Sequence, residues 1–188
     1  ITDSANAADP RAALLHIADS YAAGDTDLAW TRLTNWRIQL AAVLDQADGT
    51  PIAAVAVEGA SDSPSTILLA SWLQQALGTA VTIVMDTAGT GIRGVQLSRA
   101  SGDIRLFRHG HTVAKLTQPG QPAQWISLPR RSLQDCLAEE LRRLGPDAVF
   151  GETVRSLGIS TVHQECLEAL TGSVDRESER DRLSPISI

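Results

Sequence analysis

The chain has 188 residues, of which 43% are hydrophobic and 20% charged, and this composition predicts one globular domain with a substantial core. Its formal net charge of −6 disfavours nucleic acid and anionic membrane surfaces as partners, because both attract clustered positive charge. Two cysteines are too few for a disulfide scaffold and no apolar run approaches the ~20 residues that cross a bilayer, which indicates a reducing, cytoplasmic setting.

Residues 1–26 form an Ala- and Asp-rich lead-in segment. A short helix is expected after Asp9-Pro10, because proline suits the first position of a helix. Gly24 ends the segment. The chain begins at Ile1 with neither an initiator methionine nor a basic and apolar leader, so we expect a piece of a longer protein that does not open on a signal peptide.

A long amphipathic helix is expected from Asp27 to about Gln46, because apolar residues recur there at steps of three and four. Asp25 or Thr26 can cap its first amides. Its first turns carry two tryptophans and two arginines: Trp30, Arg32, Trp36 and Arg37. Trp36 lies on the apolar stripe and Trp30 does not. Trp30 is therefore either an exposed anchor for a partner or a side chain packed beneath the lead-in segment.

A β-α-β unit follows. The unbroken small-apolar run from Ile52 to Val57 is typical of a central strand covered on both faces. Ser63-Pro64 then begins a helix that Gly78 ends, and residues 81–85 form the next strand.

Alternating polar and apolar residues between positions 95 and 128, with turns at 100–103 and 109–110, predict an antiparallel meander. A helix over about 131–144 follows, with one apolar face made of Leu133, Cys136, Leu137, Leu141 and Leu144. A short helix is expected from Asp147.

The predicted fold class is therefore α/β, with a mixed sheet in which the β-α-β unit precedes the meander, flanked by amphipathic helices. We expect residues 1–158 to form the domain. Residues 159–188 are expected to form a divergent, largely disordered tail, because from Gly172 onward the chain is polar and has no apolar period.

Two motifs suggest a ligand but are better explained by turns. The sequence from Gly89 to Gly94 matches G-x-G-x-x-G, yet an alternating strand follows it where a dinucleotide site needs a helix. His109 and His111 flank a turn glycine without a third metal ligand nearby in the sequence, so a solvated turn is favoured over a metal site. We expect no cofactor and no metal.

Two weaker candidates remain. The loop containing Gly59, Ser61 and Ser63 precedes a helix whose free amides attract anions, although Glu58 and Asp62 repel them, so a structural cap is favoured there. Cys136 is a buried thiol by default, with redox activity as the minor alternative. Arg130 and Arg131 oppose the dipole at the start of their helix, which suggests an acidic group elsewhere in the chain or on a partner.

Two segments carry a resemblance to a known family. They run from Ala23 to Arg37, Ala-Gly-Asp-Thr-Asp-Leu-Ala-Trp-Thr-Arg at its start, and from Leu128 to Leu144, with Pro-Arg-Arg at one end and Arg-Arg-Leu at the other. Together they resemble the carboxy-terminal domain of OpcA, the glucose-6-phosphate dehydrogenase assembly protein. The resemblance covers about residues 1–147, and the sequence departs from the pattern after about Gly151.

The resemblance implies a non-catalytic assembly factor and allosteric activator. Its implied partners are glucose-6-phosphate dehydrogenase, in support of the oxidative pentose phosphate pathway, and the chain's own amino-terminal domain. The resemblance supplies no catalytic residue. It links some relatives to redox control, so Cys136 is retained as the candidate redox residue. The predicted partner-binding residues are Asp25, Asp27, Trp30, Arg32, Arg37, Arg130 and Arg131. The alternative function is a sugar-phosphate sensor, or an uncharacterised enzyme, that uses the loop from Gly59 to Ser63.

Overall fold

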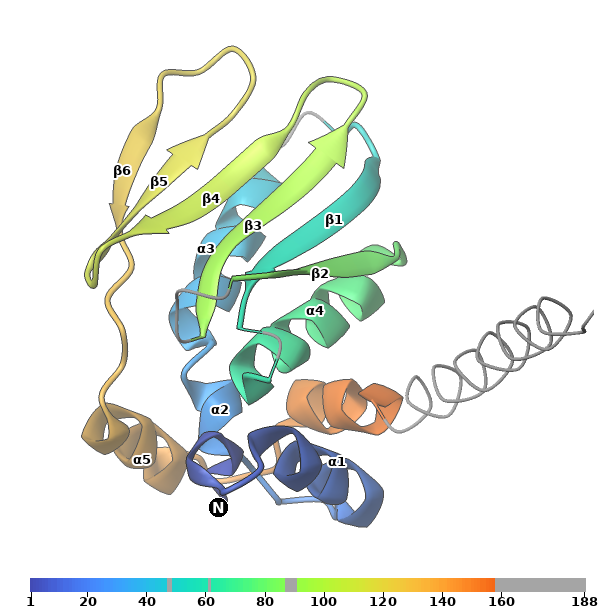
Figure 1. Cartoon of the computed structure of the whole chain (residues 1–188), viewed down its shortest axis with the longest axis vertical. Helices are drawn as coiled ribbons and strands as arrows, with labels where there is room; N and C mark the ends of the chain where they lie inside the picture. The colour runs from blue at the N-terminus through green and yellow to red at the C-terminus, as the bar shows by residue number, and fades with distance from the viewer. Residues whose placement is uncertain (47–48, 61, 87–90, 158–188) are drawn as a thin grey trace, which may run out of the picture.

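A computed structural model describes residues 1–46, 49–60, 62–86 and 91–157. Within these ranges six strands form one sheet in the order β2-β1-β3-β4-β5-β6 (Figure 1). The strands are β1 (Ile52–Gly59), β2 (Val81–Met85), β3 (Ile92–Arg99), β4 (Ile104–His109), β5 (Val113–Thr117) and β6 (Gln124–Ser127).

The strand pairing confirms the predicted mixed sheet. β1 and β2 are parallel, with Val55 opposite Val81, and they are joined by α4 (Pro64–Leu77). The chain then returns to the other side of β1, where β3 pairs antiparallel and Val57 lies opposite Val95. β4, β5 and β6 follow as an antiparallel meander.

The remaining described helices are a 3-10 helix, η1 (Ser4–Asn6), and the α-helices α1 (Pro10–Ser20), α2 (Leu28–Thr31), α3 (Thr34–Asp45), α5 (Leu133–Arg142) and a helix over residues 148–157. The single helix expected from Asp27 to Gln46 is wrong, because it is divided into α2 and α3. The Leu33 amide donates to the carbonyl of Trp30 only three residues back, which tightens the chain at the break. The Thr34 hydroxyl donates to the Thr31 carbonyl at 2.9 Å beside it.

The main core lies between the sheet and the helices on one of its faces. Leu68, Leu69 and Leu73 of α4 and Leu40 of α3 are buried there, in one cluster with Val55, Val57, Val95, Leu97, Ile104 and Leu106 of the sheet. The expectation that β1 is covered on both faces is wrong. Ala53 and Ala54 are exposed and the burial of β1 alternates from Ala54 onward, because the described helices cover only one face of the sheet.

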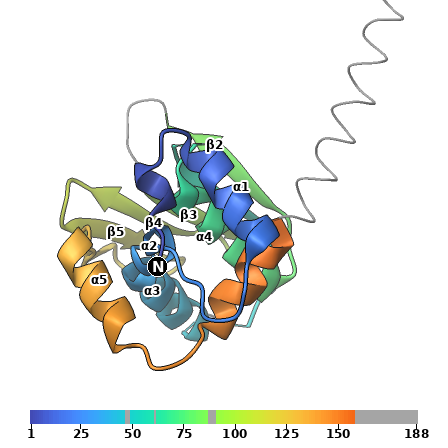
Figure 2. The same cartoon turned by 90° about the horizontal axis from the view of Figure 1, so that it is seen from below.

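Below the sheet, α1, α2, α5 and the helix over 148–157 form a lower layer (Figures 1 and 2). α2 contacts both α4 and α5. The lead-in segment joins this layer through its backbone, since the amide of Thr2 donates to the carbonyl of Thr26 and the amide of Leu28 to the carbonyl of Thr2. The lower layer thus brings the start of the chain close to α5, which is more than 100 residues away.

Candidate functional site

Trp30 is an internal residue of the lower layer. Its side chain has no exposed surface, so the expectation of an exposed anchor is wrong and the alternative of burial holds. The indole Nε1 donates to Asp147 Oδ2 at 2.9 Å, and the guanidinium of Arg37 lies 3.9 Å from the centre of its ring. Phe150 packs against it with ring centroids 5.7 Å apart. Trp30 and Arg37 therefore hold the fold together, and Trp30 offers no surface to a partner.

Asp27 is also fully buried, and it is the cap that the sequence assigned to Asp25 or Thr26. Its carboxylate accepts from the Ala29 amide at 2.8 Å, which caps α2. It also accepts from the hydroxyl of Thr2 at 2.7 Å and from the amide and hydroxyl of Ser4, each at 2.9 Å. A side chain so enclosed does not contact a partner directly. Asp25 is exposed and accepts from the amide of Ala22.

The buried side of α5 is centred on Cys136 and Glu140, beside the leucines of the expected apolar face. Glu140 is only 6% exposed and accepts from the Thr31 hydroxyl at 2.7 Å. Arg143 lies 3.3 Å from the Glu140 carboxylate and 2.9 Å from that of Asp147. Arg131 pairs with Glu139 at 2.6 Å and donates to the Thr31 carbonyl at 2.9 Å. Ion pairs and hydrogen bonds therefore attach α5 to α2.

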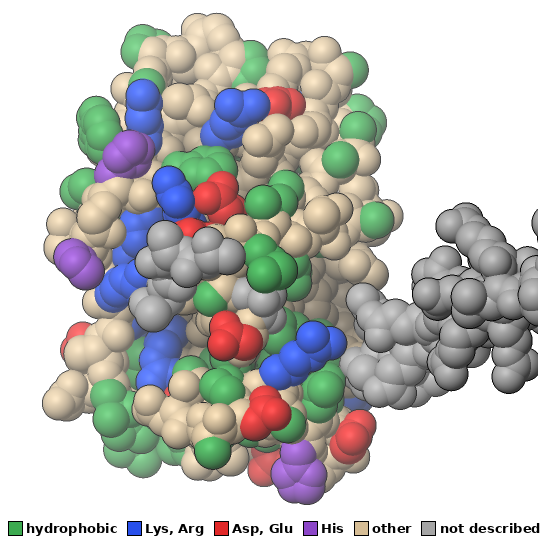
Figure 3. All heavy atoms as spheres, viewed as in Figure 1, with side chains coloured by type: hydrophobic (Ala, Val, Ile, Leu, Met, Phe, Trp, Pro, Cys, Tyr) green, Lys and Arg blue, Asp and Glu red, His purple; other side chains and the backbone are tan. Residues whose placement is uncertain are grey.

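The leucines beside this buried side are partly or largely exposed, and Leu144 lies just beyond the end of α5 at Arg142. We call Leu133, Leu137, Leu141 and Leu144 the leucine stripe. Leu133 is 44% exposed, Leu141 74% and Leu144 102%, and Leu137 is half-buried. In Figure 3 hydrophobic side chains gather at the lower left of the molecule, over α5 as placed by Figure 1. Of the apolar face expected from the sequence, only Cys136 is buried.

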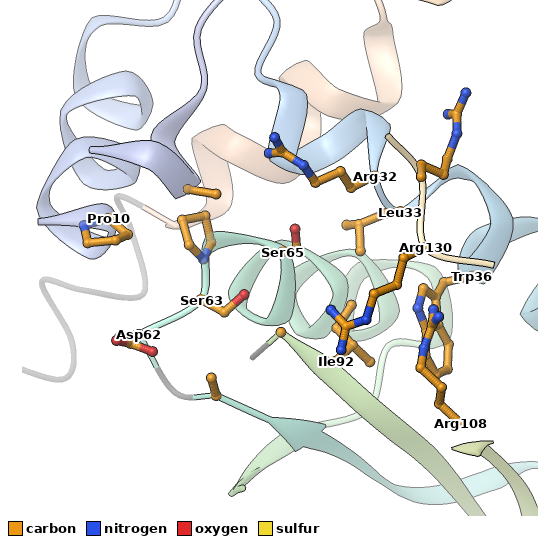
Figure 4. Close-up of a pocket in the computed structure, with 15 residues that line it drawn as sticks. Pro10, Arg32, Leu33, Trp36, Asp62, Ser63, Ser65, Ile92, Arg108 and Arg130 are labelled. Atoms are coloured by element: carbon orange, nitrogen blue, oxygen red, sulfur yellow. The ribbon is translucent and has the colours of Figure 1, made fainter. Parts of the chain in front are cut away.

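A cavity of about 480 Å³ opens between the sheet and the lower layer, at the start of α4. Four arginines line it: Arg32, Arg108, Arg130 and Arg131. Arg32 makes a bidentate contact with Asp3, at 2.6 and 2.8 Å, and Arg131 is paired with Glu139. Neither Arg108 nor Arg130 has a carboxylate partner among the described residues. Figure 4 shows Arg130 reaching toward Ser63, with Arg108 beside Trp36.

The sequence of this domain matches one family of known proteins. Residues 23–154 fit the family model that describes the C-terminal domain of a glucose-6-phosphate dehydrogenase subunit. The chain belongs to this OpcA family. No curated protein and no solved structure matches it. The fitted range ends a few residues beyond the expected limit of the resemblance and includes α5 and the cavity arginines Arg32, Arg108, Arg130 and Arg131.

In the fold of this OpcA-type domain, the residues of the predicted anion loop and of the G-x-G-x-x-G motif do not form one site. Gly59 is packed so closely that a Cβ there would lie 2.8 Å from the Gly91 carbonyl, and its loop neighbour Ser61 lies outside the described residues. Ser63 precedes α4 without a capping bond from its side chain and faces the cavity. Of G-x-G-x-x-G, Gly94 lies inside β3 against the ring of Phe107, while residues 89–90 lie outside the described part.

Cys136 is fully buried, and burial raises the pKa of its thiol despite the nearby charges of Arg131 and Arg32. His109 packs on Trp125 with ring centroids 5.1 Å apart. No group of three or more metal-ligating side chains comes together in the part of the chain that the structure describes. None of the described helices is long and apolar enough to span a bilayer.

Two features of this domain could not be predicted from the sequence pattern. Arg108 occupies a polar position of an alternating strand, and its place in the cavity depends on a fold that the strand pattern does not encode. The leucine stripe is visible in the sequence, but its spacing predicts a core face. The signal that the leucines are not the centre of the buried side is the neighbouring charged group Glu139, Glu140 and Arg143, in which Glu139 pairs with Arg131, and Arg143 pairs with Glu140 and Asp147.

Proposed function

We propose that this domain is a non-catalytic subunit that binds glucose-6-phosphate dehydrogenase in the cytoplasm, promotes its active oligomer and raises its activity, in support of the oxidative pentose phosphate pathway. Membership of the OpcA family supports the choice of partner, because the family is described as a subunit of that enzyme. The same description names a C-terminal domain, so the amino-terminal domain of the protein is the second proposed partner.

The observation that carries the proposal is the leucine stripe. Leu133, Leu137 and Leu141 are four residues apart, so they form one line along α5, and Leu144 follows just after the helix ends at Arg142. Removing a leucine side chain from water contributes about 1.5–3 kcal/mol, which makes a solvent-facing row of them a favourable surface to cover. A helix that presents apolar side chains at this spacing is a common way for one protein to bind in a groove of another.

The charged residues near the leucine stripe also favour docking of α5 on a partner. Glu140 of α5 accepts from the Thr31 hydroxyl of α2, and Arg131 just before α5 donates to the Thr31 carbonyl, so the helix is held in place and needs little ordering when it binds. Arg142 is exposed at the end of the helix, next to Leu141. An apolar groove of the dehydrogenase with an acidic rim therefore fits this surface. Asp25 and Arg130 are the exposed members of the predicted partner-binding set and stay predictions.

The test is the affinity of this chain for its purified cognate dehydrogenase, measured by isothermal titration calorimetry. Leu141→Glu places a charge in the stripe at a position that is already solvent-exposed, so the fold is unaffected. We expect it to weaken binding at least ~100-fold, the loss produced when a buried contact of about 2.7 kcal/mol is removed. Ile38→Glu is the matched control, because Ile38 is a 58% exposed aliphatic side chain on α3, outside the stripe.

Ile38→Glu should bind as the unchanged chain does. Equal loss in both variants, or no loss in Leu141→Glu, would show that the stripe is not the docking surface. The chain alone should show no turnover of glucose 6-phosphate with NADP⁺ or NAD⁺. Turnover by the purified chain that disappears in Ser63→Ala would overturn the non-catalytic role and favour an enzyme at the start of α4.

A further inference from the structure

The cavity at the start of α4 carries a second inference, which is independent of docking by the leucine stripe. Its positive charge is unusual in a chain whose formal net charge is −6. In Figure 3 basic side chains gather on the face between the sheet and the lower helices, where the cavity lies. Arg32 and Arg131 are paired, which leaves the charges of Arg108 and Arg130 unmatched among the described residues.

Arg108 is held in a fixed position by the protein without being neutralised. Its Nη1 donates to the carbonyl of Leu128 at 2.7 Å and that of His111 at 3.3 Å, and its guanidinium lies 5.4 Å from the centre of the Trp36 ring. Its Nε is buried with no acceptor in the described structure. Burial and the like charge of Arg130 lower the pKa of Arg108 to about 10, so the two guanidinium groups repel each other and an anion between them would relieve that repulsion.

Arg130 faces Arg108 from the linker that precedes α5. Its Nη1 lies 3.7 Å from the point where a Cβ on Gly91 would stand, and the Ser63 hydroxyl lies 3.9 Å from the same point. Gly91 has φ +75°, which favours glycine and leaves this space open. The guanidinium, the hydroxyl and the start of α4 therefore converge. The positive end of the helix dipole adds to the charge of the arginines at this point.

The rest of the cavity suits the body of a small metabolite. Leu33, Trp36 and Ile92 supply apolar walls, and Asp62 is an acid at the rim. Figure 4 shows the Asp62 carboxylate at the far side of the start of α4 from Arg130, with Ser63 between them. The volume of about 480 Å³ falls within the range of about 300–1,000 Å³ that is typical of ligand sites.

We propose that this cavity binds a phosphorylated small metabolite, with its phosphate held by Arg130, Arg108 and the Ser63 hydroxyl and its body against Trp36 and Ile92. Two guanidinium groups match the charge of a phosphate monoester, which is close to a dianion at neutral pH. A monoanionic carboxylate would neutralise only one of them. The site gives the domain a sensor for such a metabolite, whichever surface binds the dehydrogenase.

The experiment is a calorimetric titration of the 188-residue chain alone with three probes: glucose 6-phosphate, inorganic phosphate and glucose. We expect glucose 6-phosphate to bind with a stoichiometry of one and to bind more tightly than inorganic phosphate, since the cavity also has walls for the sugar. Glucose, which lacks the charge, should not bind. Binding of glucose 6-phosphate should tighten as the pH rises through about 6, where the second phosphate proton is lost.

Arg130→Gln is the decisive variant, because Arg130 is exposed, its side chain makes no hydrogen bond or ion pair within the described residues, and its loss should leave the fold intact. We expect it to weaken binding of glucose 6-phosphate at least ~10-fold, the loss of one charge-assisted contact. Arg105→Gln is the matched control, since Arg105 lies on the same strand as Arg108 and is paired with Asp103 outside the cavity. Arg108→Gln should weaken binding further, and its melting temperature shows whether it is folded.

Binding that is equal in the unchanged chain and in Arg130→Gln would overturn the site. If inorganic phosphate binds as tightly as glucose 6-phosphate, the cavity does not recognise the body of a metabolite, and the proposal of a metabolite site is contradicted in favour of a simple anion site. No binding of any probe would overturn the proposal entirely. None of these results bears on the dehydrogenase complex, whose test uses Leu141→Glu.

Discussion

The indole of Trp30 donates to the carboxylate of Asp147 at 2.9 Å, across 117 positions of the chain. The same carboxylate oxygen also accepts from Arg143 Nη1 at 2.9 Å, and the guanidinium of Arg37 covers the indole ring. This relationship joins α2 to the turn before the last described helix. It explains why Trp30 stabilises the fold and offers no exposed surface to a partner.

Trp30→Phe tests that relationship. The variant keeps an aromatic ring in the core but removes the N–H, so Asp147 loses a donor in a place with little water. We expect the free energy of unfolding to fall by about 1–3 kcal/mol, as measured by urea denaturation. Trp125→Phe is the control, because Trp125 is 61% exposed on β6 and its indole makes no hydrogen bond to another described residue. A fall of the same size in both variants would contradict the role of the Trp30–Asp147 bond.

Asp27→Ala should loosen the lead-in segment. It removes the cap of α2 and the acceptor for Thr2 and Ser4, so buried donors lose their partner. We expect a loss of about 2–4 kcal/mol in the free energy of unfolding and faster hydrogen exchange at Ser4. Asp25→Ala removes only an exposed acceptor for the Ala22 amide and should cost less than ~1 kcal/mol. Unchanged protection of the Ser4 amide from hydrogen exchange in Asp27→Ala would show that Asp27 does not hold the lead-in segment in place.

Acid should destabilise the chain through Asp147 and Asp3. Burial raises the pKa of Asp147, but the bonds from Trp30 and Phe150 and the charge of Arg143 outweigh it, so the pKa lies below the ordinary 3.8. The hydrogen bond from Arg32 lowers the pKa of Asp3 in the same way. Groups whose pKa is depressed by folding stabilise the fold above the unfolded pKa, and that stability is lost as the pH falls through the folded value.

The check is the urea midpoint of the unchanged chain and of Asp147→Asn, measured at neutral pH and again below pH ~4, the unperturbed carboxyl range. Asp147→Asn should be less stable at neutral pH and should lose less on acidification, because it has no proton to gain. An identical fall in both chains would show that Asp147 does not contribute to the acid sensitivity.

Cys136 should react slowly in the native chain. Its side chain is fully buried and burial raises the pKa of the thiol, so both access and the thiolate fraction are low. In a chain with Cys166→Ser, iodoacetamide should label Cys136 at least on the order of 100-fold more slowly in buffer than in urea, because labelling requires local opening. Labelling at similar rates in both would favour an accessible, redox-active thiol.

The sheet and its order of elements were predictable, because β1, α4, β2 and the meander each carry a clear change in apolar period. The orientation of α5 was not. An apolar row on a helix indicates a buried face unless charged residues beside it are paired across the fold, and the partners Thr31, Arg131 and Asp147 become neighbours only through folding. The prediction that Trp30 is an exposed anchor failed for a related reason. Trp30 lies off the main apolar stripe, but that side of its helix packs into the lower layer.

The most direct test of the account combines complex mass and kinetics. The chain is added to purified cognate glucose-6-phosphate dehydrogenase, and light scattering is read alongside the enzyme's dependence on glucose 6-phosphate. The account predicts a heavier complex with raised activity, and with Leu141→Glu neither. An enzyme of unchanged mass and unchanged kinetics in the presence of a folded chain would contradict the proposal that this domain binds and activates it.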